Sequence, residues 1–191
     1  MSIEHESFWA GAFGSEYTAR NRVDFTERAP FWHGIIDRFK PASILEVGCN
    51  AGWNMDAIKL IDDDIIVHGV DVNHDALTEA RSKGHTVYGL PAQHIDQLPR
   101  QYDLVFTAGV LIHVPPSDLR KVMRRIVEQS TRFVVSVEYG SNDVEEVNYR
   151  GHGDRLWKRP YGLLYAEMGL RALEAGEAEG FDRCGYWVFE K

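Results

Sequence analysis

Two glycines and two carboxylates in the first half of the chain have types and a spacing that suit a ligand-binding turn. Gly48 and Gly52 follow the apolar stretch 43–47, which contains Glu46. Because glycine has no side chain, the backbone of such a turn can approach a ligand closely. Asp71 ends the next apolar stretch, where a carboxylate can accept hydrogen bonds from ribose hydroxyls. Tight turns between a strand and a helix also use glycine, so the carboxylates on both sides strengthen the prediction.

This turn departs from the fingerprint Gly-x-Gly-x-x-Gly that binds dinucleotides. Asn50 and Trp53 occupy two of its glycine positions, and their bulk disfavours a pyrophosphate at the start of the following helix. Glu46 would repel a pyrophosphate, whereas it can bind a cationic group. The turn therefore favours a ligand with a positively charged part over a dinucleotide.

A second group of chemically active residues lies late in the chain, in a polar and aromatic segment. Arginine can hold a carboxylate or phosphate through two parallel hydrogen bonds, and lysine adds a point charge. Aromatic side chains offer flat surfaces to a sugar ring. The segment predicts an anionic substrate, although its charges could instead form a solvated loop paired with Glu145, Glu146 and Asp154. The candidate substrate-binding residues are Arg150, Arg155, Trp157, Lys158 and Arg159.

Three side chains are candidates for proton transfer. His113, His152 and Asp154 could act as a general base if the acceptor is a hydroxyl, and His113 could equally be a structural histidine. Near the N-terminus, Tyr17 and Arg20 could cover a bound ligand, or the tyrosine could tether its segment to the core. The His, Cys, Asp and Glu residues lack the spacing of a metal-ligand set, so we expect no metal.

The elements that position these residues alternate between strands and helices. Short runs rich in β-branched residues predict strands, and stretches with helical periodicity follow them. Strands that are apolar almost throughout are typical of a parallel sheet covered on both faces. The predicted fold class is therefore α/β: a mostly parallel, Rossmann-like sheet with helices on both faces. Strands are expected over 43–47, 65–70, 85–88, 103–107 and 132–138, and helices over 53–61, 117–129 and from the cap Asn73 to about 83.

The two ends of the chain do not follow this alternation. Residues 1–40 form a cap segment that contains one amphipathic helix, and residues 139–162 form a long substrate-side loop without a period. A helix over 163–178 and a strand over 184–189 close the chain, with a closing strand region that looks short. Because no repeat or linker divides the sequence, residues 1–191 are expected to form one domain. The apolar side of the amphipathic helix carries Phe31, Trp32, Ile35, Ile36 and Phe39.

Composition narrows the class of protein further. The chain has 191 residues, of which 44% are hydrophobic, and a formal net charge of −8. No apolar run approaches the roughly 20 residues of a membrane helix, and the first residues lack the pattern of a signal peptide. Cys49 and Cys184 are too few for a disulfide framework. We expect a cytoplasmic protein without a membrane partner, and its acidic balance makes nucleic acid an unexpected partner.

Several motifs together resemble a known family. The turn Glu46-Val47-Gly48-Cys49-Asn50-Ala51-Gly52 resembles the acidic-x-Gly-x-x-x-Gly motif of class I S-adenosylmethionine-dependent methyltransferases, with Asn50 where glycine is common. The stretch 101–116 resembles that family's fourth-strand motif. The end segments 8–21 and 138–162 resemble the pseudaminic-acid-biosynthesis-associated methylases, which are small class I methyltransferases encoded with nonulosonic-acid sugar pathways.

The resemblance implies S-adenosylmethionine as the cofactor and methyl transfer as the reaction. The implied acceptor is an oxygen or nitrogen of a small anionic, sugar-derived metabolite. One alternative is methylation of a protein or RNA, and another is a non-catalytic protein that retains the cofactor site. The cofactor-binding residues that the resemblance and the turn imply are Glu46, Gly48, Cys49, Asn50, Gly52, Asp71, Val72, Gln93, Thr107, Tyr17 and Arg20.

Overall fold

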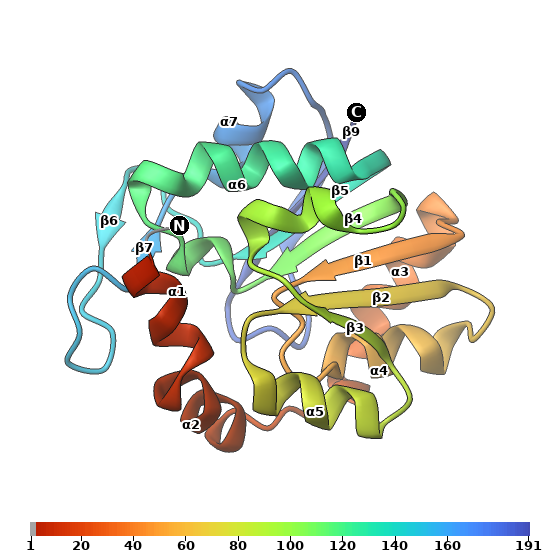
Figure 1. Cartoon of the computed structure of the whole chain (residues 1–191). Coiled ribbons are helices and arrows are strands. Elements are labelled where there is room, and N and C mark those ends of the chain that lie inside the picture. The colour runs from red at the N-terminus through yellow and green to blue at the C-terminus, as the bar shows by residue number, and fades with distance from the viewer. Residues whose placement is uncertain (1–2) are drawn as a thin grey trace.

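A computed structural model describes residues 3–191 and contains one seven-stranded sheet (Figure 1). The strand order is β3-β2-β1-β4-β5-β9-β8; the first five strands pair in parallel, and β9 runs antiparallel to both β5 and β8. The predicted α/β fold with a mostly parallel sheet is therefore confirmed. The strands are β1 (Ser43–Val47), β2 (Ile66–Asp71), β3 (Thr86–Gly89), β4 (Tyr102–Ala108), β5 (Ser130–Glu138), β8 (Arg171–Glu177) and β9 (Gly185–Glu190).

Helices cover both faces of the sheet (Figure 1). Because successive side chains of a strand point to opposite faces, Ile44 packs into one apolar core and Leu45 into the other. The first core is completed by α3 (Ala29–Phe39), α4 (Trp53–Ile61) and α5 (His74–Ser82), and the second by η2 (Ala92–Gln97), α6 (Pro116–Gln129) and α7 (Tyr161–Ala166).

Local sequence signals explain how these elements begin and end. The side chain of Asn73 accepts a hydrogen bond from the backbone N–H of Ala76, which confirms the predicted cap of α5. Helix α3 buries Phe31, Trp32, Ile35 and Ile36, so its amphipathic pattern is also confirmed. Asp103, near the start of β4, accepts hydrogen bonds from the backbone amides at positions 42 and 43, which ties the starts of β4 and β1 together.

The cap segment contains more regular structure than its sequence predicts. Before α3, the chain forms α1 (Ile3–Ala10), α2 (Ala12–Arg20) and the short helix η1 (Phe25–Arg28); residues 1–2 of the expected cap lie outside the described residues. This segment lies close to the rest of the domain at Gly14. A Cβ at this position would come within 2.8 Å of the side chain of Asn73, so glycine allows the close approach. The segment is thus anchored at the end of β2.

The expected helix over 163–178 is correct only over 163–166 and wrong after that. Helix α7 ends at Ala166, Gly169 takes a left-handed backbone (φ = 89°), and β8 follows. The sequence of β8 is rich in helix-forming Ala, Leu and Glu, but its pairing with β9 overrides that propensity. The closing region is therefore a full antiparallel hairpin rather than a shortened one.

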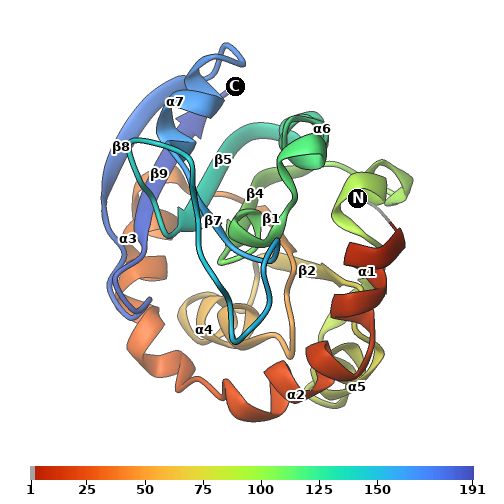
Figure 2. The same ribbon diagram turned by 90° about the vertical axis from the view of Figure 1, so that its left-hand side faces the viewer.

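The loop 139–162 is held against the N-terminal helices. It contains a two-stranded ribbon, β6 (Glu145–Glu146) and β7 (Trp157–Lys158). The ring of His5 in α1 donates to the carbonyl of Asp154 at 2.7 Å, and Figure 2 shows the loop passing close to α1. Segments about 150 residues apart in the sequence thus meet at one end of the sheet.

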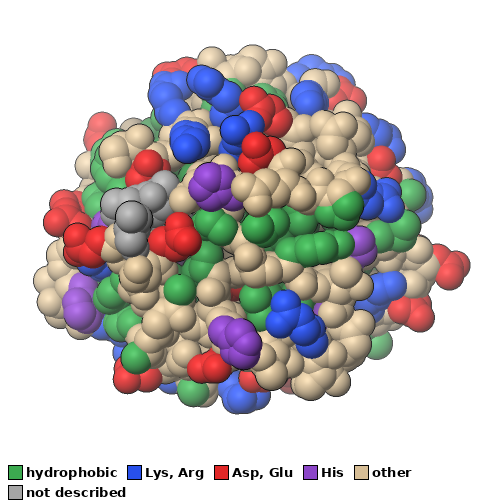
Figure 3. All heavy atoms as spheres, in the orientation of Figure 1, with side chains coloured by type: hydrophobic (Ala, Val, Ile, Leu, Met, Phe, Trp, Pro, Cys, Tyr) green, Lys and Arg blue, Asp and Glu red, His purple; other side chains and the backbone are tan. Residues whose placement is uncertain are grey.

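The outer surface carries mixed charges. Figure 3 shows Lys and Arg side chains concentrated toward the edge where α6 lies, with carboxylates among them. Within residues 3–191, no helix combines the length and apolarity needed to cross a bilayer.

Candidate functional site

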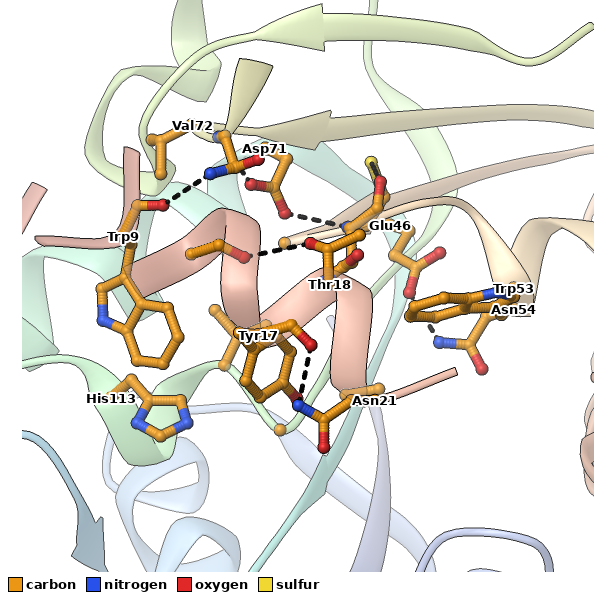
Figure 4. A pocket seen from close by; sticks show the side chains of 18 of the residues that line it. Trp9, Tyr17, Thr18, Asn21, Glu46, Trp53, Asn54, Asp71, Val72 and His113 are labelled. Carbon is orange, nitrogen blue, oxygen red and sulfur yellow. Dashed lines mark hydrogen bonds between the residues drawn. The ribbon is translucent and has the colours of Figure 1, made fainter. Parts of the chain in front are cut away.

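A cavity of about 460 Å³ opens at the carboxyl ends of β1, β2 and β4, where open α/β sheets bind ligands. Figure 4 shows Glu46 and Asn54 at one end of it, with Trp9 and His113 at the other. Of the predicted cofactor-binding residues, the cavity lining contains Glu46, Gly48, Cys49, Asn50, Asp71, Val72, Tyr17 and Arg20.

The glycine turn after β1 has the conformation that its sequence requires. Gly48 has a left-handed backbone (φ = 76°), and a Cβ there would lie 2.4 Å from a methyl group of Val110. The amides of Gly48 and Cys49 both donate to the carbonyl of Val70 at the end of β2. Glycine is therefore needed both for the backbone angle and for the close contact with Val110.

Glu46 has a carboxyl oxygen in the cavity that lacks a hydrogen-bond partner. It is buried, and its Oε1 accepts a hydrogen bond of 2.6 Å from the side-chain amide of Asn54. Its Oε2 is buried without a hydrogen-bond partner. Burial raises the pKa of Glu46 to about 8, because a charge removed from water is destabilised unless it is paired. A cation placed at Oε2 would supply the missing partner.

The orientation of Asn54 is fixed by two donors on its oxygen. Arg28 donates to Asn54 Oδ1 at 3.0 Å, and the indole N–H of Trp32 donates at 3.4 Å. The amide nitrogen of Asn54 must therefore face Glu46. Neither Asn54 nor Arg28 was singled out from the sequence, and the available signal was weak: a polar residue one position into the helix after the glycine turn.

Asp71 lies where β2 ends and faces the same cavity. Its carboxylate accepts hydrogen bonds from the backbone amides of Asn50 (2.8 Å) and Asn73 (2.9 Å). Desolvation nevertheless raises its pKa, against the lowering effect of these amides. Each carboxylate oxygen can accept a further bond, so Asp71 can hold the turn in place and still accept hydroxyl groups from a ligand.

Three of the predicted cofactor-binding residues do not line the cavity. Gly52 caps α4 with a left-handed backbone and makes room for the ring of His85. Gln93 is buried, and its amide donates to Glu6 of α1 at 3.2 Å instead of facing the cavity. Thr107 is fully buried within β4. These placements correct the cofactor contacts expected of Gly52, Gln93 and Thr107.

The N-terminal helices form an aromatic wall of the cavity. The guanidinium of Arg20 stacks on the rings of Phe13 and Tyr17, and Trp9 packs edge-on against Tyr17. Burial raises the pKa of Tyr17 to about 12, so its hydroxyl stays protonated at neutral pH. The indole nitrogen of Trp9 is buried without a partner. The wall can thus offer hydrogen-bond donors to a ligand.

His113 lines the cavity from the short helix η3 (Leu111–His113). Its Nδ1 lies 2.6 Å from the carbonyl oxygen of Arg155, so this nitrogen carries the proton of the neutral ring. Burial lowers the pKa of His113 to about 4. The ring is therefore neutral at pH 7, and Nε2 has a free lone pair to accept a hydrogen bond.

A second hollow of about 840 Å³ adjoins the first and shares part of its lining, including Tyr17, Tyr139 and His113. Two of its three arginines are engaged, because Arg22 forms a bidentate pair with Glu79 and Arg28 donates to Asn54, whereas Arg183 is exposed. The hollow is also lined by five acidic residues, Asp24, Glu27, Glu177, Glu179 and Asp182.

The predicted anion-binding cluster is not assembled. Arg159 is 1% exposed, and its guanidinium donates to the carbonyls of Leu111 (2.8 Å) and Val114 (2.7 Å). Trp157 is buried, and neither it nor Lys158 lines either cavity. The structure thus contradicts a substrate contact by Arg159, because both of its terminal nitrogens are bound to backbone.

The remaining candidate residues of the loop, Arg150, His152, Asp154 and Arg155, also line neither cavity. Arg155 pairs with Glu4 at 3.2 Å and stacks on the ring of Phe8, which ties the loop to α1. His152 packs against the ring of Phe8 as well. Together with exposed Arg150 and Asp154, these side chains do not form the substrate contacts or the base that the sequence suggested.

The described part of the chain contains no arrangement of side chains for a metal ion and no disulfide bond. Among residues 3–191, no group of three or more His, Cys, Asp or Glu side chains is arranged to hold a metal ion. Cys49 and Cys184 are buried free thiols.

Comparison with known proteins finds a family that matches part of the chain. Residues 44–130 match the family described as a methyltransferase domain, a stretch that contains the glycine turn, Asp71 and His113. With the fold, this match confirms the predicted class of enzyme, a methyltransferase. No curated protein sequence matches the chain.

Solved structures with this fold include methyltransferases for different small molecules. The sugar N-methyltransferase KedS8 from a Streptoalloteichus species is 16% identical, with a TM-score of 0.71 over 95% of this chain and 93% of its own. The magnesium protoporphyrin IX methyltransferase from Synechocystis is 12% identical, with a TM-score of 0.73 and full coverage of both chains. The 1,6-didemethyltoxoflavin-N1-methyltransferase from Burkholderia thailandensis is 14% identical, with a TM-score of 0.72 over 100% of this chain and 88% of its own. At these identities the likeness is one of fold.

Proposed function

We propose that this protein transfers a methyl group from S-adenosylmethionine to an oxygen or nitrogen atom of a small, sugar-derived metabolite. The observation that carries the proposal is the buried, unpartnered Oε2 of Glu46 beside the glycine turn. His113, with its free Nε2, lines the same cavity.

The polar groups of the cavity fit this cofactor. The Oε2 atom of Glu46 suits the ammonium group of the cofactor's amino-acid part, and Asp71 suits its ribose hydroxyls. The left-handed turn at Gly48 keeps side-chain atoms away from the space between them. When bound there, S-adenosylmethionine supplies an activated methyl group on its sulfonium.

The role of this chain is to orient the acceptor and exclude water. The lone pair on Nε2 of His113 can accept a hydrogen bond from the acceptor's N–H or O–H and so direct the acceptor's own lone pair. The pKa of His113 is about 4. The ring therefore orients the acceptor but does not keep the acceptor's proton at neutral pH. Aromatic side chains of Trp9, Tyr17 and Tyr149 surround this end of the cavity.

The charges of the second hollow favour a neutral or amine-bearing acceptor over an anionic one. Its five acidic residues outnumber its three arginines and attract a cation, and Arg22 and Arg28 are engaged by other groups, which leaves Arg183. The fold likeness to a sugar N-methyltransferase supports the same direction. An anionic acceptor, which the loop sequence alone suggests, would enter a hollow of like charge.

The test is titration calorimetry with S-adenosylmethionine, followed by transfer of a labelled methyl group to a panel of sugars. The panel pairs each amino sugar with its N-acetylated and carboxylated counterparts. Cofactor binding with transfer to amino or neutral sugars supports the proposal. Cofactor binding without transfer to any sugar refutes it, and transfer only to the carboxylated members overturns the predicted acceptor charge.

A further inference from the structure

The turn 110–114 forms a wall of both cavities. Val110, His113 and Val114 line the first cavity, and Ile112 and His113 line the second. Val110 also packs on Gly48 of the glycine turn. The turn thus presents His113 and touches the cofactor-binding turn at the same time, so its position matters to both.

A buried carboxylate holds one side of this turn. Glu138, the last residue of β5, is 0% exposed. Its Oε1 accepts hydrogen bonds from the amides of Val110 (3.2 Å) and Leu111 (3.0 Å), and its Oε2 accepts one from Ile112 (3.3 Å). Three successive backbone donors thus share one carboxylate. Glu138 lines neither cavity, so it has no direct path to a ligand.

A buried guanidinium holds the opposite side. Arg159 donates to the carbonyls of Leu111 and Val114, at 2.8 and 2.7 Å. Leu111 therefore has its N–H on Glu138 and its carbonyl on Arg159. The two charged side chains form no ion pair with each other in the described part of the chain, and they are linked through the peptide groups of the turn.

We propose that Glu138 and Arg159 are a pair of positioning residues that fix the 110–114 turn and thereby aim the His113 ring at the acceptor. Burying two charges is costly, and a simple turn could be held by backbone pairing alone. A carboxylate that binds amides and a guanidinium that binds carbonyls remove the freedom of the turn to rotate. The role of His113 in this inference rests on the proposed function, whereas the positioning of its ring can be tested without any acceptor.

The surroundings of His113 make its ring a sensitive reporter of that position. Its Nδ1 donates to the carbonyl of Arg155, and its ring packs on Trp9 of α1 and Tyr149 of the loop. His5 of α1 lowers its pKa, and Tyr149 is a second titratable group beside it. If the turn moves, the ring loses its bond to the carbonyl of Arg155 and gains contact with water. Both the tautomer and the protonation of His113 would then change.

The experiment compares Glu138→Gln and Arg159→Lys with the wild type by nitrogen NMR of the histidine rings, in the presence of S-adenosylmethionine. In Glu138→Gln, the side-chain NH₂ group faces a backbone N–H, so two hydrogen-bond donors meet. In Arg159→Lys, a single ammonium replaces a guanidinium that donates to two carbonyls. We expect the pKa of His113 to rise by at least one unit toward 6.5 in both variants, with loss of its single tautomer. With an acceptor in hand, kcat should fall at least tenfold, and the acid limb of its pH profile should move upward.

Val134→Ala is the matched control. It removes two buried methyl groups from the same strand, β5, and lowers stability without touching the turn. It should leave the His113 signals and the pH profile unchanged. The double variant of Glu138 and Arg159 should lose less stability than the sum of the single variants, because both act on one turn.

Wild-type hydrogen exchange keeps the inference testable even if the variants do not fold. The amides of Val110, Leu111 and Ile112 should exchange as slowly as those inside β5. Rapid exchange at these three amides, or an unchanged His113 signal in folded variants, would overturn the positioning role. A protein that transfers no methyl group but passes these tests would refute the proposed function while retaining the pair.

Discussion

The glycine-turn region and the end segments of this molecule use their charged residues in opposite ways. In the region that contains β1 and β2, Glu46 and Asp71 face the cavity, and Glu46 keeps a free oxygen. In the loop 139–162, Arg155 and Arg159 are bound by protein groups and line neither cavity. The carboxylates near the ends of β1 and β2 thus remain available to a ligand, whereas the arginines of the loop hold the walls together.

The largest expected effect is that of Gly48→Ala, which tests the glycine-turn region. A left-handed backbone costs alanine about 1–2 kcal/mol, and the contact with Val110 adds a further overpacking cost of about 1–3 kcal/mol. We expect a loss of about 2–5 kcal/mol in the free energy of unfolding, measured by urea denaturation, and a loss of cofactor affinity. Gly84→Ala is the control, because Gly84 has φ = 91° but open space at its Cβ position; it should cost only about 1 kcal/mol. Equal losses in the two variants would show that the contact with Val110 is unimportant.

Glu46→Gln should weaken cofactor binding while preserving the fold. A hydrogen bond to a charged group is worth about 1.5–3 kcal/mol, so we expect the Kd for S-adenosylmethionine to rise roughly tenfold to a hundredfold by calorimetry. Glu27→Gln, a carboxylate of the second hollow, should leave this Kd unchanged. Equal affinities for Glu46→Gln and the wild type would remove Glu46 from the cofactor site.

The free protein should become less stable as the pH rises from 6.5 to 8.5. The pKa of Glu46 in the folded protein is about 8 and that of Glu138 about 7, both above the usual 4.5. A carboxyl with a raised pKa favours the folded state at low pH, and its contribution is lost as the pH rises through that pKa. His113 stays neutral in the folded protein, whereas in the unfolded chain it loses its proton near pH 6.5, which offsets a small part of the fall at the lower end of this window. We expect a fall of about 1–2 kcal/mol, which Glu46→Gln should reduce; a flat stability profile would contradict the burial of these charges.

Two arginine variants of the loop should have small effects, and they sharpen the contrast between the regions. Arg155→Ala breaks the pair with Glu4 and the stacking on Phe8, which should cost about 1 kcal/mol of stability. Arg150→Ala removes an exposed charge and should change stability by less than about 0.5 kcal/mol. Neither should lower kcat/KM more than a few-fold. A tenfold loss for Arg150→Ala would restore the idea of an anionic substrate held by the loop.

The sequence allowed the central fold to be predicted because its signals are local. Strand boundaries at Ser43 and Val47, the cap at Asn73 and the exact span of α4 depend on apolar periodicity and short-range hydrogen bonds. The placement of Glu46 and Asp71 at one cavity followed from the same logic, since the ends of neighbouring parallel strands must meet.

The roles of the end segments could not be predicted because they depend on long-range contacts. Arg159 belongs to a cluster of basic residues that is typical of an anion-binding site. Its actual partners are two carbonyls of the turn 110–114, about 45 residues earlier in the chain. Strand β8 contains helix-forming residues, and only its pairing with β9 makes it a strand. Glu138 ends an apolar strand, and nothing local shows that it receives three amides.

The reversed direction of β9 has a consequence for how the protein is made. Its first residue, Gly185, pairs with Glu138, so the loop before it returns to the ligand-binding edge of the sheet. There, Arg28 stacks on Phe181, and Tyr139 donates to Asp182. A ribosome builds the chain from its N-terminus, so Arg28 emerges more than 150 residues before these partners do. The nascent chain can form β1 to β5 while this side of the site is still open, and the second hollow is completed only after the segment before β9 has been synthesised.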